Sequence, residues 1–210
     1  MPVRKVSNRS KKNTIGDFPS IKMKRMIAFE SLIERDGIYT FDFDPDVLAF
    51  EEQPFSIEYE HGKKKRRYTP DFLLKKLDHS VVVECKPTVF VDTPENRRKF
   101  DVARQWCDEH EYRFQVLTDT ELRAGSRLEN IKLITRFARQ RVGPEMRSRI
   151  YGLLYSLESD VTVNFLASHV SPTNPRIAIS AILHMAFHHE VVLPLNEAKV
   201  TGDTLVSLAH

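Results

Sequence analysis

Two short stretches decide the fold, Tyr68-Thr69-Pro70-Asp71-Phe72 and Val82-Val83-Glu84-Cys85-Lys86-Pro87. Both are rich in apolar residues that favour strands, and residues 75–80 between them leave room for a polar turn. Successive side chains on a strand point to opposite faces of the sheet. We therefore expect Glu84 and Lys86 on one face, Cys85 on the other, and Asp71 beside Glu84.

This arrangement brings two carboxylates and an ammonium group close together. Buried charges are costly unless they are paired or bound to metal, and the oxygens of Asp71 and Glu84 suit Mg²⁺ or Mn²⁺. Metal ions at such a site activate water and stabilise the leaving oxygen of an in-line displacement. Lys86 would orient the water or neutralise developing charge. The pattern indicates a metal-dependent nuclease; the plainer interpretation is an edge hairpin with a solvated Glu/Lys pair.

Four motifs, in this order and spacing, resemble a known family. Pro70-Asp71 followed by Glu84-x-Lys86 is similar to the signature of the PD-(D/E)xK, or restriction-endonuclease-like, superfamily. With the stretches 29–36 and 46–55, the chain from about Gly16 to Arg141 resembles the N-terminal domain of TnsA-like endonucleases. The resemblance implies an α/β fold in which helices flank a mixed sheet.

The same resemblance implies the residues of the site. An acid in a Ser-x-x-Glu setting completes the metal site in the family, and Ser31-Leu32-Ile33-Glu34 fits that setting; Glu30, one turn earlier, stays an alternative. The implied catalytic residues are Glu34, Asp71, Glu84 and Lys86, and the implied metal ligands are Glu34, Asp71, Glu84 and the backbone carbonyl of Cys85. Gln53 belongs to the family pattern, either near the site or, as we favour, satisfying backbone groups at a strand entry.

For function, the resemblance implies a DNA endonuclease that uses Mg²⁺, with Mn²⁺ as a substitute and two ions bound. It would cut the 5′ strand at transposon ends during cut-and-paste transposition. Its partners would be double-stranded DNA, a DDE-type transposase and an AAA+ regulator. Two alternatives stay open: a stand-alone restriction or repair nuclease of the same superfamily, and a non-catalytic DNA-binding scaffold.

Basic residues cluster in two segments that could contact DNA. Residues 1–15 carry Arg4, Lys5, Arg9, Lys11 and Lys12 and are expected to form a flexible arm. The run Lys63, Lys64, Lys65, Arg66 and Arg67 is either a solvated hairpin tip or a phosphate-contacting loop. We add Arg97 and Arg98 to the candidate DNA contacts.

The composition suits a protein with one main domain and a small one. The chain has 210 residues, a formal net charge of +3 and two cysteines, which indicates no disulfide framework. It contains no apolar stretch of membrane-spanning length and no signal-peptide pattern. We expect a soluble protein of the bacterial cytoplasm that associates with the nucleoid when bound to DNA.

Periodicity predicts the remaining elements of the nuclease domain, residues 16–142. Helices are expected over 21–35, ending near Gly37, over 94–110 and over 129–141. Strands are expected over 55–60, 68–74, 81–86 and 112–117, the last one parallel to the third. Asp119 is expected to cap a short helix.

The region 143–210, beginning near Gly143-Pro144, is predicted to be a winged-helix-like domain. Helices are expected over 145–157, 161–169 and 175–189, followed by a hairpin of 191–195 with 199–208. The third helix would contact either DNA or a protein, since it offers Arg176 but is otherwise apolar and His-rich. His184, His188 and His189 suggest a metal cluster at first sight, but ordinary surface or core histidines are favoured because no acid or Cys pair is near in sequence.

Overall fold

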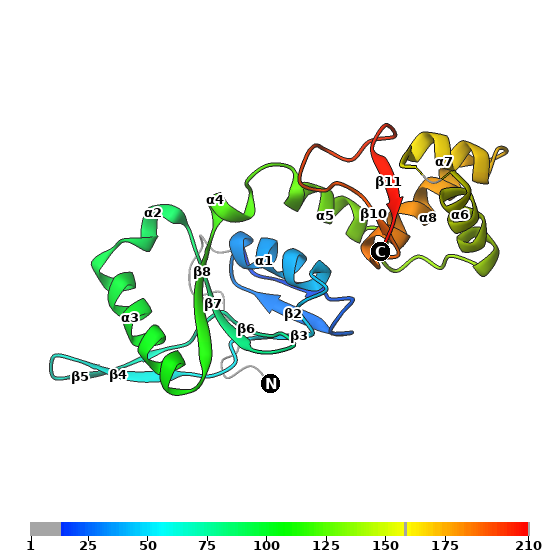
Figure 1. Ribbon diagram of the computed structural model, residues 1–210. Helices are drawn as coiled ribbons and strands as arrows, with labels where there is room; N and C mark the ends of the chain where they lie inside the picture. Colours follow the sequence, from blue (N-terminus) through cyan, green and yellow to red (C-terminus); the bar gives the residue numbers. More distant parts are fainter. Residues whose placement is uncertain (1–13, 158, 210) are drawn as a thin grey trace. The chain divides into compact units, whose positions relative to one another are not determined.

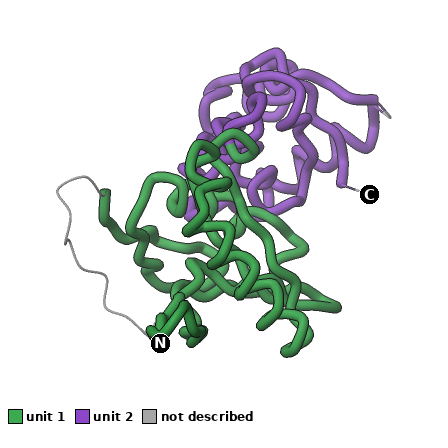
Figure 2. The backbone as a smooth tube through the Cα atoms, turned by 90° about the vertical axis from the view of Figure 1, so that its left-hand side faces the viewer, with its two compact units in different colours: residues 1–122 green, residues 123–210 purple. Residues whose placement is uncertain are grey.

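The computed structural model describes residues 14–157 and 159–209 and divides the chain into two compact units (Figure 2). Unit 1 ends at Leu122 and unit 2 begins at Arg123. The predicted boundary at 142/143 is therefore too late, because the helix that follows Leu122 packs within unit 2. The predicted basic arm, residues 1–15, lies almost wholly outside the described residues.

The main sheet of unit 1 has the strand order β3-β6-β7-β8 (Figure 1). Its strands are β3 (Ala49–Glu52), β6 (Phe72–Lys75), β7 (Ser80–Lys86) and β8 (Tyr112–Thr118). β6 is antiparallel to both β3 and β7, whereas β8 is parallel to β7. The chain reaches β8 through α2 (Thr88–Val91) and α3 (Pro94–Glu109), as a parallel pairing requires. This mixed α/β architecture is the predicted one.

The two faces of β7 pack against different helices. Val81, Val83 and Cys85 lie in a buried cluster with residues of α1 (Leu32–Phe43). Ala103 of α3 lies in a second buried cluster on the other side of the sheet. The alternation predicted for this strand is thus observed, with the Cys85 thiol in the core next to α1.

The predicted helix over 21–35 is wrong. Residues 16–29 form a hairpin of β1 (Gly16–Pro19) and β2 (Met26–Phe29), and α1 follows. The Asp42 carboxylate accepts hydrogen bonds from the Ser20 hydroxyl and from the backbone N–H groups of Ile21 and Lys22. These hydrogen bonds fix residues 20–22 in the loop that joins the two strands. Asp42, a residue distant in sequence, thus decides the local structure against the helical periodicity.

Gly37, expected to end that helix, lies inside α1 instead. A Cβ atom at this position would come 3.2 Å from Cζ of Phe41 and 3.6 Å from Sγ of Cys85. A side chain here would press on the Phe41 ring of the same helix, whereas Cys85 of β7 lies at an ordinary contact distance.

The predicted strands near residue 60 lie outside the main sheet. β4 (Ile57–His61) and β5 (Lys64–Tyr68) form a separate hairpin beside α3 (Figure 1). The predicted strand over 68–74 therefore begins late, since Tyr68 ends β5 and β6 starts at Phe72. Strand β3 was not predicted.

Asp119 does not cap the helix α4 (Asp119–Leu122) that it begins. The Thr118 hydroxyl accepts a hydrogen bond from the Glu121 backbone N–H at 3.2 Å. In return, the Glu121 carboxylate accepts one from the Thr118 backbone N–H at 2.9 Å. This reciprocal pair is a capping box. Asp119 instead accepts hydrogen bonds from the backbone N–H and hydroxyl of Thr88, at the start of α2.

Unit 2 contains helices and a small antiparallel sheet of order β10-β11-β9. Its elements are α5 (Arg127–Thr135), α6 (Pro144–Leu157), β9 (Val161–Thr162), α7 (Val163–Val170), α8 (Pro175–Phe187), β10 (Val191–Val192) and β11 (Leu205–Leu208). The three predicted helices and the hairpin are present, and α5 ends before the predicted residue 141. The winged-helix assignment stays a prediction. In the described part of the chain, no helix is long and apolar enough to cross a membrane.

Asn130 ties α5 to the connection between β10 and β11. Its buried side-chain amide donates to the carbonyls of Leu195 at 2.8 Å and Ala198 at 2.7 Å and accepts from Val200 N–H at 2.9 Å. We expect Asn130→Ala to destabilise unit 2 by about 3 kcal/mol, since three backbone groups lose their partner. Chemical unfolding followed by circular dichroism measures this loss. Asn196→Ala, at an exposed neighbouring amide, is the control; equal stability of the two variants would contradict the assignment.

Candidate active site

Asp71 and Glu84 lie side by side where β6 begins and β7 ends. Phe72 pairs with Val83 across the two strands, so the preceding residue Asp71 lies next to Glu84. The Cys85 backbone N–H donates to Oδ2 of Asp71 at 2.7 Å, which fixes the carboxylate against β7. The antiparallel register therefore brings the two predicted acids together.

Glu84 is buried and both of its oxygens are hydrogen-bonded. Lys86 Nζ lies 2.8 Å from Oε1, and the Tyr68 hydroxyl donates to Oε2 at 2.8 Å. Tyr68 is itself buried, and its pKa is raised by burial and by the charge of Glu84. Sequence reasoning missed Tyr68 as a partner of Glu84; its place three positions before Asp71 was the only signal.

Glu34 is in the first turn of α1, where the chain forms a capping box. The Ser31 hydroxyl accepts from Glu34 N–H at 3.2 Å and donates to Oε1 of Glu34 at 2.8 Å, while Glu30 N–H donates to Oε2 at 2.7 Å. Ser31 therefore sets both the start of α1 and the direction of the Glu34 side chain. Of the two acids that the sequence left open, Glu34 has a charge that raises the pKa of Asp71.

Neighbouring charges act on Asp71, Glu34 and Lys86. Burial raises the pKa of Asp71 well above its usual range, and the charges of Glu84 and Glu34 raise it further. Burial also raises the pKa of Glu34, to which the charges of Glu30 and Glu84 add. Burial alone would lower the pKa of Lys86, but Glu84 beside it raises the pKa above the ordinary value. The site thus concentrates negative charge, with Lys86 as the nearby cation.

The chemistry of these donors fits a hard divalent cation. Carboxylate oxygens are the ligands that Mg²⁺ and Mn²⁺ prefer, and such a cation would offset the repulsion that raises the two carboxyl pKa values. However, residues 14–157 and 159–209 contain no group of three His, Cys, Asp or Glu side chains positioned to hold a metal ion. The capping box, Tyr68 and Lys86 engage oxygens of Glu34 and Glu84 instead. The acids are neighbours but do not form a ready-made cage.

The comparison with protein families agrees with this geometry. Residues 44–119 match the model of the TnsA-like endonuclease N-terminal domain. Unit 1 carries a TnsA-like endonuclease domain. No curated protein matches the chain. The matched segment contains Asp71, Glu84 and Lys86 but not Glu34, whose place in the site rests on the structure. The mixed sheet of this domain is consistent with a restriction-endonuclease-like fold.

Gln53 lies beside Asp71 of the candidate active site in the TnsA-like domain. Its backbone N–H donates to the Asp71 carbonyl at 2.8 Å, and its φ of 45° is in the left-handed region that a non-glycine residue seldom adopts. Among the described residues its buried side-chain oxygen has no hydrogen-bond partner. The favoured role of its side chain, satisfying backbone groups, is therefore not observed for this oxygen.

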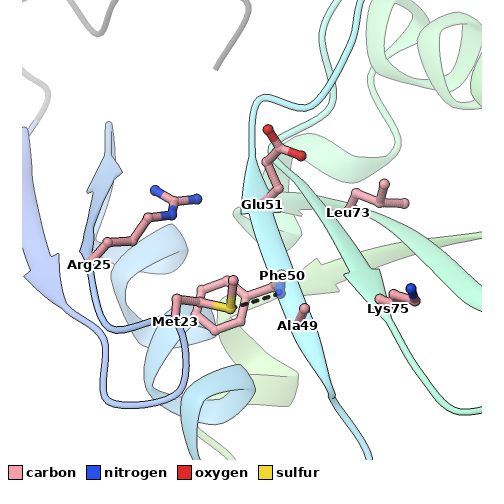
Figure 3. A pocket seen from close by; sticks show the side chains of 7 residues that line it. All are labelled: Met23, Arg25, Ala49, Phe50, Glu51, Leu73 and Lys75. Carbon is pink, nitrogen blue, oxygen red and sulfur yellow. Dashed lines mark hydrogen bonds between the residues drawn. The ribbon is translucent and has the colours of Figure 1, made fainter. Parts of the chain in front are cut away.

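A pocket of about 530 Å³ in the TnsA-like domain lies away from these acids (Figure 3). Its lining extends across β3, from the loop before β2 to β6, and the Phe50 backbone N–H points to Sδ of Met23 at 3.4 Å (Figure 3). Arg25, Glu51 and Lys75 are the charged residues of its lining. None of the predicted catalytic residues lines this largely apolar pocket, which is therefore separate from the candidate active site.

The candidate DNA contacts of the TnsA-like domain occupy two elements. Lys63 lies in the turn of the β4–β5 hairpin, and residues 64–67 belong to β5, so the run forms a strand and not merely a tip. Arg97 and Arg98 lie on α3, where Arg97 forms a salt bridge with Asp92 at 3.1 Å. The two predicted groups therefore occupy neighbouring elements, as expected if both contact one ligand.

The rings of His184 and His188 lie together in unit 2, with centroids 4.4 Å apart, and each ring bonds a backbone carbonyl. His184 is buried; its Nδ1 lies 3.0 Å from the Phe137 carbonyl and its Nε2 3.2 Å from the Arg147 guanidinium. Because a carbonyl only accepts and a guanidinium only donates, Nδ1 carries the proton. His188 Nε2 bonds the Ala138 carbonyl at 2.9 Å. These bonds join α8 to the segment after α5.

Proposed function

We propose that this protein is a Mg²⁺-dependent DNA endonuclease that cuts the 5′ strand at transposon ends during cut-and-paste transposition. The observation that carries the proposal is the contact of Asp71 with the Cys85 amide beside Glu84 and Lys86, inside a TnsA-like endonuclease domain. That arrangement combines acids for a metal with a cation for developing negative charge.

Each residue has a role in this proposal. Glu34, Asp71, Glu84 and the carbonyl of Cys85 would hold Mg²⁺, or Mn²⁺ in its place, as two ions. When bound, the ions supply an activated water and charge stabilisation at the phosphate. Lys86 orients the attacking water and stabilises the charge that develops on the phosphate oxygens. Tyr68 and Ser31 hold Glu84 and Glu34 in position through their hydroxyl groups.

The proposed partners are a DDE-type transposase, which cuts and joins the other strand, and an AAA+ regulator. We place the regulator contact on unit 2. Large apolar side chains are exposed there, including Tyr155 at 79% and Ile177 at 53%. The order of helices and strands in unit 2 supports a winged-helix-like domain, and these apolar side chains favour a protein contact over base readout by α8.

Strand-specific cleavage tests the proposal. A duplex carrying one transposon end, labelled separately on each strand, is incubated with this protein, the partner transposase and the regulator. We expect a cut in the 5′ strand alone, lost in EDTA and restored by Mg²⁺ or Mn²⁺. Cleavage that persists in EDTA would refute the metal assignment.

The same assay separates the alternatives. Equal cutting of unrelated duplexes by this protein alone would identify a stand-alone nuclease. An assembled complex that binds the end but leaves the 5′ strand intact would identify a non-catalytic scaffold. Three observations argue against a scaffold. The charges of neighbouring acids raise the pKa of Asp71 and of Glu34, Lys86 lies 2.8 Å from Glu84, and among the described residues no arginine forms a salt bridge with any of the three acids.

A further inference from the structure

The basic residues 64–67 of the β4–β5 hairpin lie alternately on its two faces. Glu58 pairs with Arg67 and Glu60 with Lys65 across the two strands, so that face carries acids opposite its bases. Arg67 is bonded to Glu58 at 2.9 Å. The alternate residues point to the other face, where Tyr59 lies opposite Arg66 and His61 opposite Lys64. That face is basic with no acid from the hairpin, although both faces belong to one run of sequence.

The basic face borders a groove of about 380 Å³ whose other wall is α3. We call it the hairpin–α3 groove; its lining includes Tyr59, His61, Arg66, Arg67, Arg98 and Lys99. Glu95 is the acid in this lining, and Lys99 bonds it at 2.8 Å. Arg67 of the lining is bonded to Glu58 of the other hairpin face, so Arg66 and Arg98 are the cations that the groove itself offers.

Arg66 of β5 and Arg98 of α3 line the same groove, and the charges of both act on Glu95. The pKa of Glu95 is lowered first by the hydrogen bond and charge of Lys99, then by the charges of Arg98 and Arg66. Within residues 14–157 and 159–209, neither arginine forms a salt bridge. Glu95 near them is bonded to Lys99, so two guanidinium groups at one groove are left without a salt bridge of their own. Such a pair is suited to phosphate, which arginine binds through two parallel hydrogen bonds.

The groove is connected to the candidate active site through β5. Tyr68 at the end of that strand donates to Glu84, and Arg66 is two residues earlier on the same face. At about 3.4 Å per strand residue, Arg66 lies roughly 7 Å along β5 from Tyr68. The groove and the candidate active site are therefore close enough to contact one stretch of duplex DNA.

We propose that the hairpin–α3 groove binds the sugar-phosphate backbone of duplex DNA through Arg66 and Arg98, independently of sequence. This inference rests on the proposed function, because it gives the nuclease a place to hold its substrate. The proposal also separates the predicted DNA contacts into residues that bind phosphate and residues that do not. Arg66 and Arg98 bind phosphate, whereas Lys65, opposite Glu60, and Arg97, bonded to Asp92, do not.

Two double variants of the full chain test the groove. Arg66→Gln with Arg98→Gln removes both proposed contacts. Lys65→Gln with Arg97→Gln removes the same charge one residue away in each element and is the matched control. Binding to an unrelated-sequence duplex is measured by fluorescence anisotropy in EDTA at several salt concentrations.

We expect the groove variant to bind about tenfold more weakly or worse, and its slope of log affinity against log salt to fall by about 2, since two phosphate contacts are lost. The control should lose less than about threefold in affinity and keep the wild-type slope. Arg66→Lys with Arg98→Lys should restore most of the salt slope, because the charges return. Thermal unfolding should be alike for all variants, because both arginines are exposed.

An equal loss of DNA affinity in both double variants would overturn the proposal, because it would show that the overall positive charge, and not the two groove arginines, binds the duplex. No loss in either, or no duplex binding by the wild type, would overturn it as well. A different result would refute the nuclease proposal and leave the groove intact. The groove variant would still bind DNA more weakly than its control, but the assembled wild-type complex would leave the 5′ strand uncut.

Discussion

Asp71→Asn is expected to abolish cleavage of the transposon end while making the metal-free protein more stable. Asparagine retains an oxygen for the Cys85 N–H but loses the charge that a divalent ion needs. We expect cleavage to fall by about 10³-fold or more. Stability should rise because the raised pKa of Asp71 means that burial, Glu84 and Glu34 disfavour its ionised form in the fold.

Strand cleavage and thermal unfolding in EDTA measure the two effects of Asp71→Asn separately. Asp101→Asn is the control, since Asp101 is exposed on α3 and bonded only at the surface to Arg104. It should leave cleavage unchanged and stability within about 0.5 kcal/mol. Wild-type cleavage by Asp71→Asn would remove Asp71 from the catalytic site.

Lys86→Met is expected to lose cleavage as well, but to destabilise the metal-free protein. The ammonium group lies 2.8 Å from Glu84, and its charge lowers the pKa of Asp71. Methionine keeps the apolar stem and removes this compensation for the neighbouring carboxylates. We expect cleavage to fall by about 10²-fold to 10³-fold. The free energy of unfolding should fall by about 2 kcal/mol, less than for a fully buried pair because Lys86 is partly exposed.

Lys99→Met is the matched control for stability. Its bond to Glu95 is also 2.8 Å long but lies on the surface of α3, where Glu95 is 71% exposed. Such surface pairs contribute at most about 1 kcal/mol. A Lys86→Met protein as stable as Lys99→Met would show that Lys86 does not offset the charge of the acids. The opposite stability changes at Asp71 and Lys86, with the same loss of cleavage, distinguish a functional charge cluster from a structural ion pair.

Local patterns predicted the centre of unit 1 correctly. The twofold repeat of a strand placed Glu84 and Cys85 on opposite faces, and the polar connection placed Asp71 beside Glu84. The length of the connection after Lys86 predicted a helical crossover and a parallel β8. These features depend on residues close together in sequence.

The errors arose where distant residues decide the structure. Asp42 holds the turn that replaces the predicted helix over 21–35, and Asn130 bonds a loop near residue 200 and so assigns α5 to unit 2. The Tyr68 bond to Glu84 likewise joins two strands that do not pair with each other. No periodicity in a single segment carries this information.

Gly37 lies on the side of α1 that faces both Phe41 of the same helix and Cys85 of β7. A Cβ at this position would press on the Phe41 ring and would touch the sulfur of Cys85. Glu34 is one turn earlier on the same helix. A substitution at position 37 that displaced α1 would therefore also displace the carboxylate of Glu34, although residue 37 itself carries no chemical group of the candidate site.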